Sequence, residues 1–296
     1  MISRGSIEQA AGRIRDRVRT TPVLELEAGA FGCPAQLFLK LELLQHTGSF
    51  KPRGAFNRML AGDLPEAGVI AASGGNHAAA VAFAARQLGC SAEIFVPETT
   101  PELKIERVRQ HGARITLAGR SYAEAFAASS ARADKTGALV VHAYDQEDVL
   151  AGQGTLGREL AAQLPDLDTV LVAVGGGGLI GGIAAWFEGE VRVIGVESTG
   201  TATLARALEA GRPVDIEVSG LAADSLGARR VGGLMFPIAQ RFVERVVIVD
   251  DSEIRSAQRA LWDRLRIVAE PGGAAAFAAV LSGKYQPQPG DRKSVV

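Results

Sequence analysis

Two residue types are scarce in this chain: cysteine and lysine. Its 296 residues include only two cysteines, Cys33 and Cys90, which lie far apart and show neither a metal-binding spacing nor a disulfide pattern. We therefore expect two buried, reduced thiols. Only six of the 32 basic residues are lysines, so the chain uses arginine wherever a positive charge alone is sufficient. A lysine within a motif is then a candidate for amine chemistry.

Charge excess and long apolar runs are also missing. The formal net charge is −1 and like charges do not cluster, which gives no electrostatic basis for binding nucleic acid or an anionic membrane. No apolar run is long enough to span a bilayer, and the basic helix expected over residues 7–19, capped by Ser6, lacks the apolar centre of a signal peptide. We expect a cytoplasmic protein that acts on a small molecule.

Strands and helices alternate along most of the chain. The pattern predicts strands at 23–26, 37–44, 68–72, 92–96, 114–118, 138–142, 168–174, 191–197 and 244–249, and helices at 49–61, 76–88, 102–111, 121–136, 147–164, 178–188, 252–265 and 271–282. Strands rich in Val, Ile and Ala between helices are typical of parallel sheets covered on both faces. The predicted fold class is α/β, with open, twisted, mostly parallel sheets, helices on both faces and two interleaved lobes.

The stretch Thr47-Gly48-Ser49-Phe50-Lys51-Pro52-Arg53-Gly54-Ala55 lies where a strand gives way to a helix. We expect Ser49 and Lys51 in the first helical turn, where backbone N–H groups and the helix dipole favour an anion. A lysine among these groups and near Arg53 loses its proton more easily than a solvated one, and an imine-forming lysine needs the neutral amine. The alternative is a helix-start lysine that only adds solubility.

A second motif, Ser73-Gly74-Gly75-Asn76-His77, joins the predicted strand 68–72 to an alanine-rich helix. Such a turn at a helix N-terminus presents N–H groups without obstruction from side chains, which suits a carboxylate. The alternative is an ordinary N-capped helix start. We expect His77 to be a packed, hydrogen-bonded side chain and assign it no proton transfer.

A third motif follows the apolar strand 168–174: Gly175, Gly176, Gly177 and Gly178 precede Leu179. Four glycines at a strand-to-helix junction let the backbone surround a phosphate with its N–H groups. Gly176, Gly178 and Gly181 also satisfy the dinucleotide-binding spacing, with Glu197 about 20 residues after the loop as the ribose-binding acid. An NAD(P)-binding oxidoreductase of the Rossmann type is therefore a serious alternative.

The three motifs together separate these alternatives. A dinucleotide enzyme gives no reason for a lysine and an asparagine turn at two earlier helix starts, all at the carboxyl ends of parallel strands. A phosphate loop, an amine nucleophile and a carboxylate-binding turn are what a pyridoxal-phosphate enzyme needs.

With segments 151–155 (Ala-Gly-Gln-Gly-Thr) and 269–274 (Ala-Glu-Pro-Gly-Gly-Ala), these motifs resemble the fold type II pyridoxal-phosphate enzymes, specifically the serine/threonine dehydratase and serine racemase group. The resemblance runs from Thr21 to the last residue. It implies a large cofactor domain of residues 1–51 and 145–296, a small domain of residues 52–144 inserted in it, and a homodimer.

The resemblance also implies roles for individual residues. Lys51 would hold the cofactor as a Schiff base, with Phe50 beside it, and would be the catalytic residue. Asn76 would reach the cofactor's ring hydroxyl, the glycines of 175–178 would bind its phosphate, and Ser73, Gly74, Gly75, Asn76 and His77 would bind the substrate carboxylate. The implied reaction is β-elimination from L-threonine or L-serine to a 2-keto acid and ammonia.

Departures from the family pattern refine this interpretation. Racemases of the group carry a serine where this chain has Gly74, and racemisation needs that second acid-base group whereas elimination does not. Tyr144-Asp145 stands where dehydratases tend to carry Phe-Asp, which also favours dehydratase over serine racemase. Segment 220–225 resembles the family's loop that faces the distal end of the substrate but departs from it in detail. We expect Asp224 or Ser225 to tune specificity there, so 3-hydroxyaspartate stays open as a substrate.

Two further departures concern metal and the C-terminus. Members that bind Mg²⁺ or Ca²⁺ use a Glu matching Glu197 and a carboxylate six residues on, where this chain has Thr203. A hard cation prefers several carboxylate oxygens, so a metal site at Glu197 is weakened but stays open. The alternative role for Glu197 is a local cap or ion pair. The family's Ser or Cys at the pyridine nitrogen has no counterpart before the sequence stops. Ser294 comes too early, and residues 290–296 read as a turn and a strand cut short.

Overall fold

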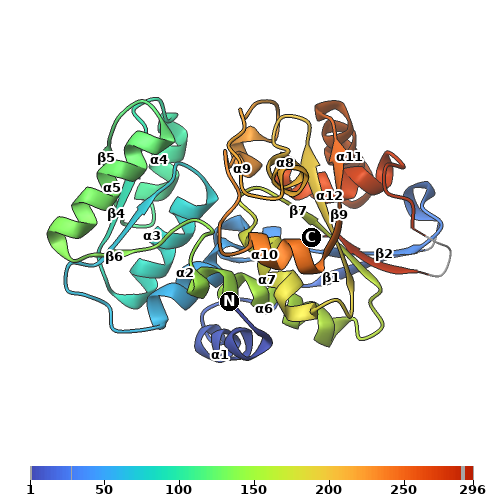
Figure 1. Cartoon of the computed structure of the whole chain (residues 1–296), viewed down its shortest axis with the longest axis horizontal. Helices are drawn as coiled ribbons and strands as arrows, with labels where there is room; N and C mark the ends of the chain where they lie inside the picture. The colour runs from blue at the N-terminus through green and yellow to red at the C-terminus, as the bar shows by residue number, and fades with distance from the viewer. Residues whose placement is uncertain (1, 28, 288–290, 296) are drawn as a thin grey trace.

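Two separate sheets form the framework of the protein (Figure 1). The computed structural model describes residues 2–27, 29–287 and 291–295, with only the backbone of the last strand. The larger sheet has six strands in the order β1-β2-β10-β7-β8-β9, of which only β1 runs antiparallel to its neighbour. Its strands are β1 (Val23–Leu26), β2 (Gln36–Lys40), β7 (Thr169–Ala173), β8 (Arg192–Ser198), β9 (Val243–Val249) and β10 (Arg292–Val295).

The smaller sheet has four parallel strands in the order β5-β4-β3-β6. They are β3 (Val69–Ala72), β4 (Ala92–Val96), β5 (Arg114–Leu117) and β6 (Leu139–Val140). All four lie in one continuous part of the chain, inserted between β2 and β7 of the larger sheet. The α/β class and the mostly parallel sheets are confirmed; the domain boundaries at 51/52 and 144/145 stay a prediction.

Helices cover both faces of each sheet. They are α1 (Arg4–Ile14), α2 (Lys51–Leu60), α3 (Asn76–Leu88), α4 (Glu102–Arg109), α5 (Tyr122–Thr136), α6 (Glu147–Gln163), α7 (Gly178–Phe187), α8 (Thr203–Ala210), α9 (Ala223–Leu226), α10 (Phe236–Phe242), α11 (Asp251–Leu265) and α12 (Pro271–Leu281). Along β7, Val170 and Val172 face α1, α6, α7 and α10, whereas Leu171 faces α11 and α12. This alternation follows from the two-residue period of a strand. None of the helices in the described ranges is long and apolar enough to cross a membrane.

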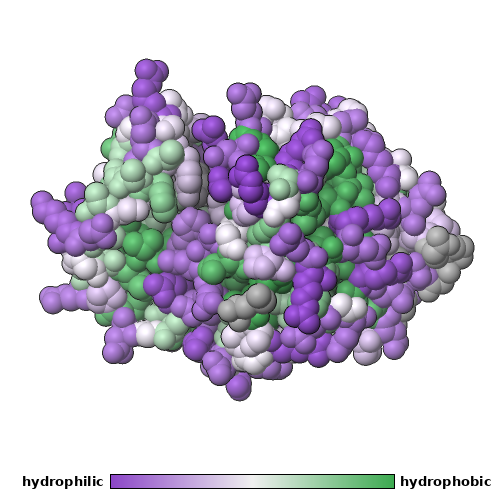
Figure 2. Space-filling model, viewed as in Figure 1, coloured by the Kyte–Doolittle hydropathy of each residue, from purple (hydrophilic) through white to green (hydrophobic). Residues whose placement is uncertain are grey.

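Polar residues cover most of the face seen in Figure 2, and apolar residues reach it only in separate areas. The two thiols form no disulfide: Cys33 is buried as expected, but Cys90 is only partly buried.

Some predicted boundaries are wrong for identifiable reasons. The first helix begins at Arg4 because Ser3 and Ser6 form a reciprocal capping box, and it ends at Ile14 instead of Arg19. The strand expected over 37–44 ends at Lys40, where the chain turns into a 3₁₀ segment, Glu42–Leu44. Ser49 is extended and lies outside the helix that Lys51 begins.

A buried cluster of four charged side chains connects these elements. Arg53 in α2 is 1% exposed and donates from Nε and Nη2 to Glu42 at 2.8 and 2.7 Å, and from Nη1 to Glu159 in α6 at 2.9 Å. Lys40, at the end of β2, donates to the same Glu159. The two cations and two carboxylates balance in charge, which is how such groups are tolerated in an interior. The cluster therefore ties the start of α2 to β2 and α6.

We predict that Arg53→Met lowers the free energy of unfolding by about 3–5 kcal/mol, because it leaves the buried carboxylate of Glu42 without its cation and leaves Glu159 paired with Lys40 alone. Urea denaturation measures the change. The control is Arg114→Gln, which removes an exposed guanidinium 3.8 Å from Glu93 and should cost about 0–1 kcal/mol. Equal losses in the two variants would contradict the prediction.

Candidate active site

The N-terminal ends of α2, α3 and α7 carry the three predicted motifs, and side-chain contacts connect them. Lys51 at the start of α2 donates from Nζ to the carbonyl oxygen of Ala143 at 2.8 Å. The next residue, Tyr144, packs against the glycine loop before α7. Asn76 at the start of α3 hydrogen-bonds Glu270, whose charge acts on Lys51. Segments far apart in sequence thus meet at the carboxyl ends of parallel strands, as ligand sites in α/β proteins do.

Lys51 is the amine of this site. Burial of its ammonium lowers the pKa to about 8, and the Glu270 carboxylate opposes that shift. The Nζ atom also lies 5.1 Å from the centre of the Phe50 ring. The expected contribution of Arg53 is wrong, because Glu42 and Glu159 neutralise that guanidinium. Desolvation therefore makes the neutral amine more accessible near neutral pH than in a solvated lysine.

The loop before α3 matches its predicted shape. Ser73 Oγ accepts a hydrogen bond from the Gly75 N–H at 3.2 Å, and Gly75 precedes the first helical residue, Asn76. His77 is buried, its Nε2 lies 2.9 Å from the Val141 carbonyl oxygen, and burial lowers its pKa to about 3. His77 is therefore neutral and packed, as expected. Its backbone N–H remains at a helix N-terminus, where a carboxylate is favoured.

The glycine loop before α7 leaves no room for side chains. Gly177 has φ +87°, and a Cβ on Gly176 would lie 2.3 Å from Tyr144 Cδ1. Within the described residues, no protein acceptor is paired with the amide N–H of Gly175, Gly176 or Gly177. Unpaired N–H groups beside a helix N-terminus fit a phosphate.

Several residues near Lys51 were not singled out from the sequence. Thr47 has φ +62°, unusual for a β-branched residue, and its carbonyl oxygen accepts from Arg107 Nη2 at 2.7 Å. The buried hydroxyls of Thr47 and Ser49 have no hydrogen-bond partner among the described residues. The only available signal was their position in the lysine motif. Both residues lie within four positions of Lys51 in the chain, and their hydroxyls retain unused hydrogen-bonding capacity.

Glu197 does not form a metal site with its neighbours. Its two oxygens accept from the backbone N–H groups of Leu204 and Ala205 at 2.7 and 2.9 Å, and burial raises its pKa to about 7. Thr203 donates its hydroxyl to the Ala228 carbonyl oxygen at 2.8 Å. Over the described ranges, no group of three or more His, Cys, Asp or Glu residues is placed to hold a metal ion. The contacts fit the alternative role, a cap on α8, and do not fit Mg²⁺ or Ca²⁺.

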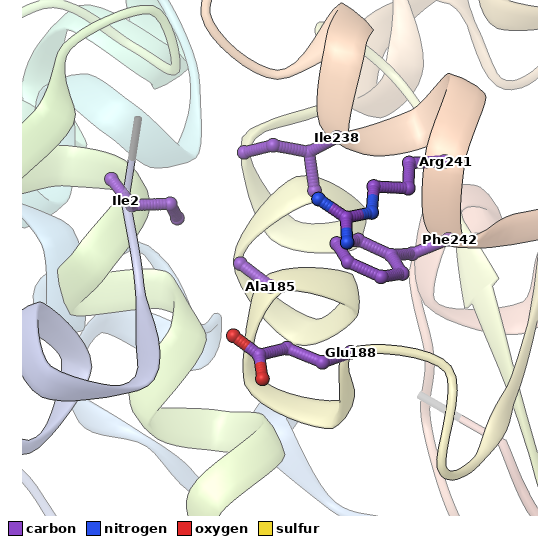
Figure 3. Close-up of a pocket in the computed structure, with 6 residues that line it drawn as sticks. All are labelled: Ile2, Ala185, Glu188, Ile238, Arg241 and Phe242. Carbon is purple, nitrogen blue, oxygen red and sulfur yellow. The ribbon is translucent and has the colours of Figure 1, made fainter.

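A cavity of about 230 Å³ lies at the opposite end of α7 (Figure 3). It is lined by Ile2, Ala185, Glu188, Ile238, Arg241 and Phe242. None of these residues belongs to the three motifs, and along α7 the first lining residue, Ala185, lies about 10 Å from the glycine loop. The cavity is therefore distinct from the candidate active site.

Comparison with known proteins agrees with this geometry. The family model described as pyridoxal-phosphate dependent enzyme matches residues 14–296. The chain belongs to this family. An L-threonine ammonia-lyase of Geobacter sulfurreducens is 40% identical over 281 residues, covering 93% of this chain and 70% of that protein.

Two solved structures are similar over almost the whole chain. Maize serine racemase has a TM-score of 0.94 at 33% identity, covering 99% of this chain and 92% of its own. A threonine deaminase from the organism abbreviated T.th. has a TM-score of 0.92 at 35% identity, covering 99% and 96%. The cofactor is therefore pyridoxal phosphate, and the alternative of a Rossmann-type oxidoreductase is wrong. The fold alone does not separate racemase from deaminase.

The turn expected at residue 290 lies outside the described residues, as does the side chain of Ser294. The backbone of β10 pairs with β2 and β7, which confirms the strand predicted there.

We predict that Lys51→Ala abolishes the visible absorbance of the lysine-bound cofactor and the covalent adduct that borohydride reduction leaves on this lysine. Turnover should fall by about 10²–10⁴-fold or more, because the amine is lost. Visible absorbance and peptide mass spectrometry measure the first effect. Lys135→Ala, which removes an exposed lysine of α5, should change neither property. Borohydride fixation at another lysine would contradict the assignment.

The Glu197 contacts generate a separate prediction. A chelator should leave the melting temperature and activity of the enzyme unchanged. Glu197→Gln should lower the free energy of unfolding by about 1–3 kcal/mol, because an amide cannot accept from both backbone N–H groups. Glu209→Gln, at an exposed pair with Arg206 on the same helix, should cost about 0–1 kcal/mol. A melting temperature that falls with chelator and recovers with Mg²⁺ would overturn this account.

Proposed function

We propose that this protein is a pyridoxal-phosphate dependent ammonia-lyase that converts L-threonine or L-serine into a 2-keto acid and ammonia. The L-threonine ammonia-lyase and threonine deaminase among its relatives support this reaction. The observation that carries the proposal is that the site has a lysine at residue 51 and a glycine at residue 74. One amine with a lowered pKa stands at the site, and the position that bears a serine in racemases has no side chain.

Each motif has a defined task in this reaction. The N–H groups of Gly175 to Gly178 would hold the cofactor phosphate, and Asn76 would contact the ring hydroxyl. The loop from Ser73 to His77 would bind the substrate carboxylate. Pyridoxal phosphate, when bound, supplies the electron sink that stabilises negative charge at Cα.

Proton transfer would depend on Lys51. Its neutral amine takes the Cα proton, the β-hydroxyl leaves with a proton as water, and the unsaturated amine released then adds water and loses ammonia. The net change is one hydroxy-amino acid into one 2-keto acid and one ammonia. His77 takes no part, because its ring is neutral and bonded to Val141.

The end of the substrate beyond Cβ would face Asp224 and Ser225. Lys104 in α4 forms an ion pair with Asp224, and Ser225 Oγ accepts from the Gly272 N–H at 2.9 Å. A second substrate carboxylate would compete with Asp224 for Lys104. These contacts favour threonine or serine over 3-hydroxyaspartate.

The proposal includes the wider organisation of the enzyme. Residues 1–51 and 145–296 would form the cofactor domain, residues 52–144 the small domain, and two copies a homodimer in the cytoplasm. The four-stranded sheet between β2 and β7 supports the inserted small domain.

The test is incubation of the cofactor-loaded enzyme with L-threonine, L-serine and 3-hydroxyaspartate, followed by 2-keto acid assay and chiral analysis. We expect 2-keto acid from threonine or serine as the dominant product. D-serine as the dominant product, or no product from either substrate, would overturn the proposal.

Gly74→Ser sharpens this test, because it adds the hydroxyl that racemisation needs. The new Cβ would lie 3.1 Å from Thr100 Cγ2, so the loop must adjust slightly. Gly74→Ala causes the same crowding without the hydroxyl and is the matched control. We expect D-isomer from the serine variant only.

A further inference from the structure

Glu270 stands directly before α12, where a side chain often caps the helix, but its carboxylate forms no cap bond. It turns instead toward α3, where its Oε1 accepts from Asn76 Nδ2 at 2.7 Å. The proposed reaction assigns Asn76 to the cofactor ring and gives Glu270 no task. The side chain of a site residue is therefore fixed by a carboxylate of unassigned function.

Charged groups from several elements surround this carboxylate. The side chain of Glu270 remains exposed to solvent, and partial desolvation by the surrounding protein raises its pKa. The bond from Asn76, the guanidinium of Arg107 and the ammonium of Lys51 lower that pKa, and Asp224 raises it. In return, Glu270 raises the pKa of Lys51 against the effect of burial. Its charge and its geometry thus act on two residues of the candidate active site.

If Glu270 had only a structural role, its bond to Asn76 would serve to hold α3 and the start of α12 together. The ion pair between Lys104 and Asp224 already makes such a connection from α4 to α9, and Arg107 makes another to Thr47. Neither of these two contacts includes Asn76 or Lys51. The bond from Asn76 to Glu270 is the one that orients a residue expected at the cofactor.

We propose that Glu270 is a positioning residue: it orients the Asn76 amide toward the cofactor ring and supplies the negative charge that balances Lys51. With one Nδ2 hydrogen held by Glu270, the other hydrogen and Oδ1 of Asn76 have fixed directions. The nearby carboxylate keeps a larger fraction of Lys51 protonated than burial alone would. This inference rests on the proposed function for the identity of the cofactor contact.

The first test uses the cofactor-free enzyme and needs no turnover. Lys51 is acylated with acetic anhydride at several pH values, and its modification is followed by peptide mass spectrometry. Glu270→Gln removes the charge that raises the Lys51 pKa, so more neutral amine is present and labelling at pH 7 should be roughly two- to fivefold faster. Labelling of Lys51 at the wild-type rate would overturn the proposal.

The second test measures the dissociation constant for pyridoxal phosphate by visible absorbance. Glu270→Asp keeps the charge but draws the carboxylate back by one methylene, so Lys51 labelling should stay close to wild type while the dissociation constant rises roughly tenfold. Should Glu270→Gln fail to fold, this variant alone decides the positioning role. An unchanged dissociation constant would contradict it.

Glu102→Gln is the control, since it removes an exposed carboxylate of α4 that pairs with Arg109. It should change neither labelling nor cofactor binding. The outcomes also remain separable from the proposed function. An enzyme that binds the cofactor but yields no 2-keto acid refutes the reaction, whereas the labelling experiment still reports on Glu270.

Discussion

The buried ion cluster around Arg53 is the constraint on which the site depends. Arg53 lies two residues after Lys51, and its guanidinium is held by Glu42 and Glu159 with Lys40 alongside. Removing one member would leave an uncompensated charge in the interior, so the four groups hold together as a unit. The start of α2 is thereby fixed to β2 and α6, and Lys51 enters the site from a backbone that cannot easily shift. A reactive amine requires such a support, because small displacements reduce catalysis strongly.

The site around this amine relies on desolvation and backbone dipoles more than on net charge. Burial lowers the pKa of Lys51 and of His77. For Lys51 this favours the neutral, nucleophilic amine, and for His77 it leaves a neutral ring that is too weakly basic to take a proton. Anion binding is assigned to N–H groups at two helix starts, which carry no titratable proton. Such a site can hold an anionic cofactor and a carboxylate while leaving a single amine to accept a proton.

The features encoded in consecutive residues could be predicted from the sequence, whereas contacts between distant residues could not. Alternating strands and helices, the glycine loop and the loop at Asn76 are encoded in consecutive residues, so local pattern was enough to find them. The bond from Asn76 to Glu270 joins residues 194 positions apart, and the Arg53 cluster joins residues of β2, α2 and α6. Arg53 was read as a neighbour of Lys51, although its charge is directed away. Sequence proximity gives no side-chain direction, and neutralisation by distant partners is invisible before folding.

Glu197 shows how one side chain can change role without changing its fold position. In a metal-binding relative, a second carboxylate would share the cation with it; here Thr203 supplies a hydroxyl that is used by the Ala228 carbonyl oxygen. The carboxylate of Glu197 accepts hydrogen bonds from two backbone N–H groups at the start of α8. It therefore caps this helix instead of coordinating a metal ion. Because α8 follows the strand next to the phosphate loop, the cap keeps this edge of the site in place without a cation. With a hydroxyl at residue 203 in place of a carboxylate, Glu197 has no acidic partner six residues on with which to share a cation, and its oxygens are used by the backbone of α8.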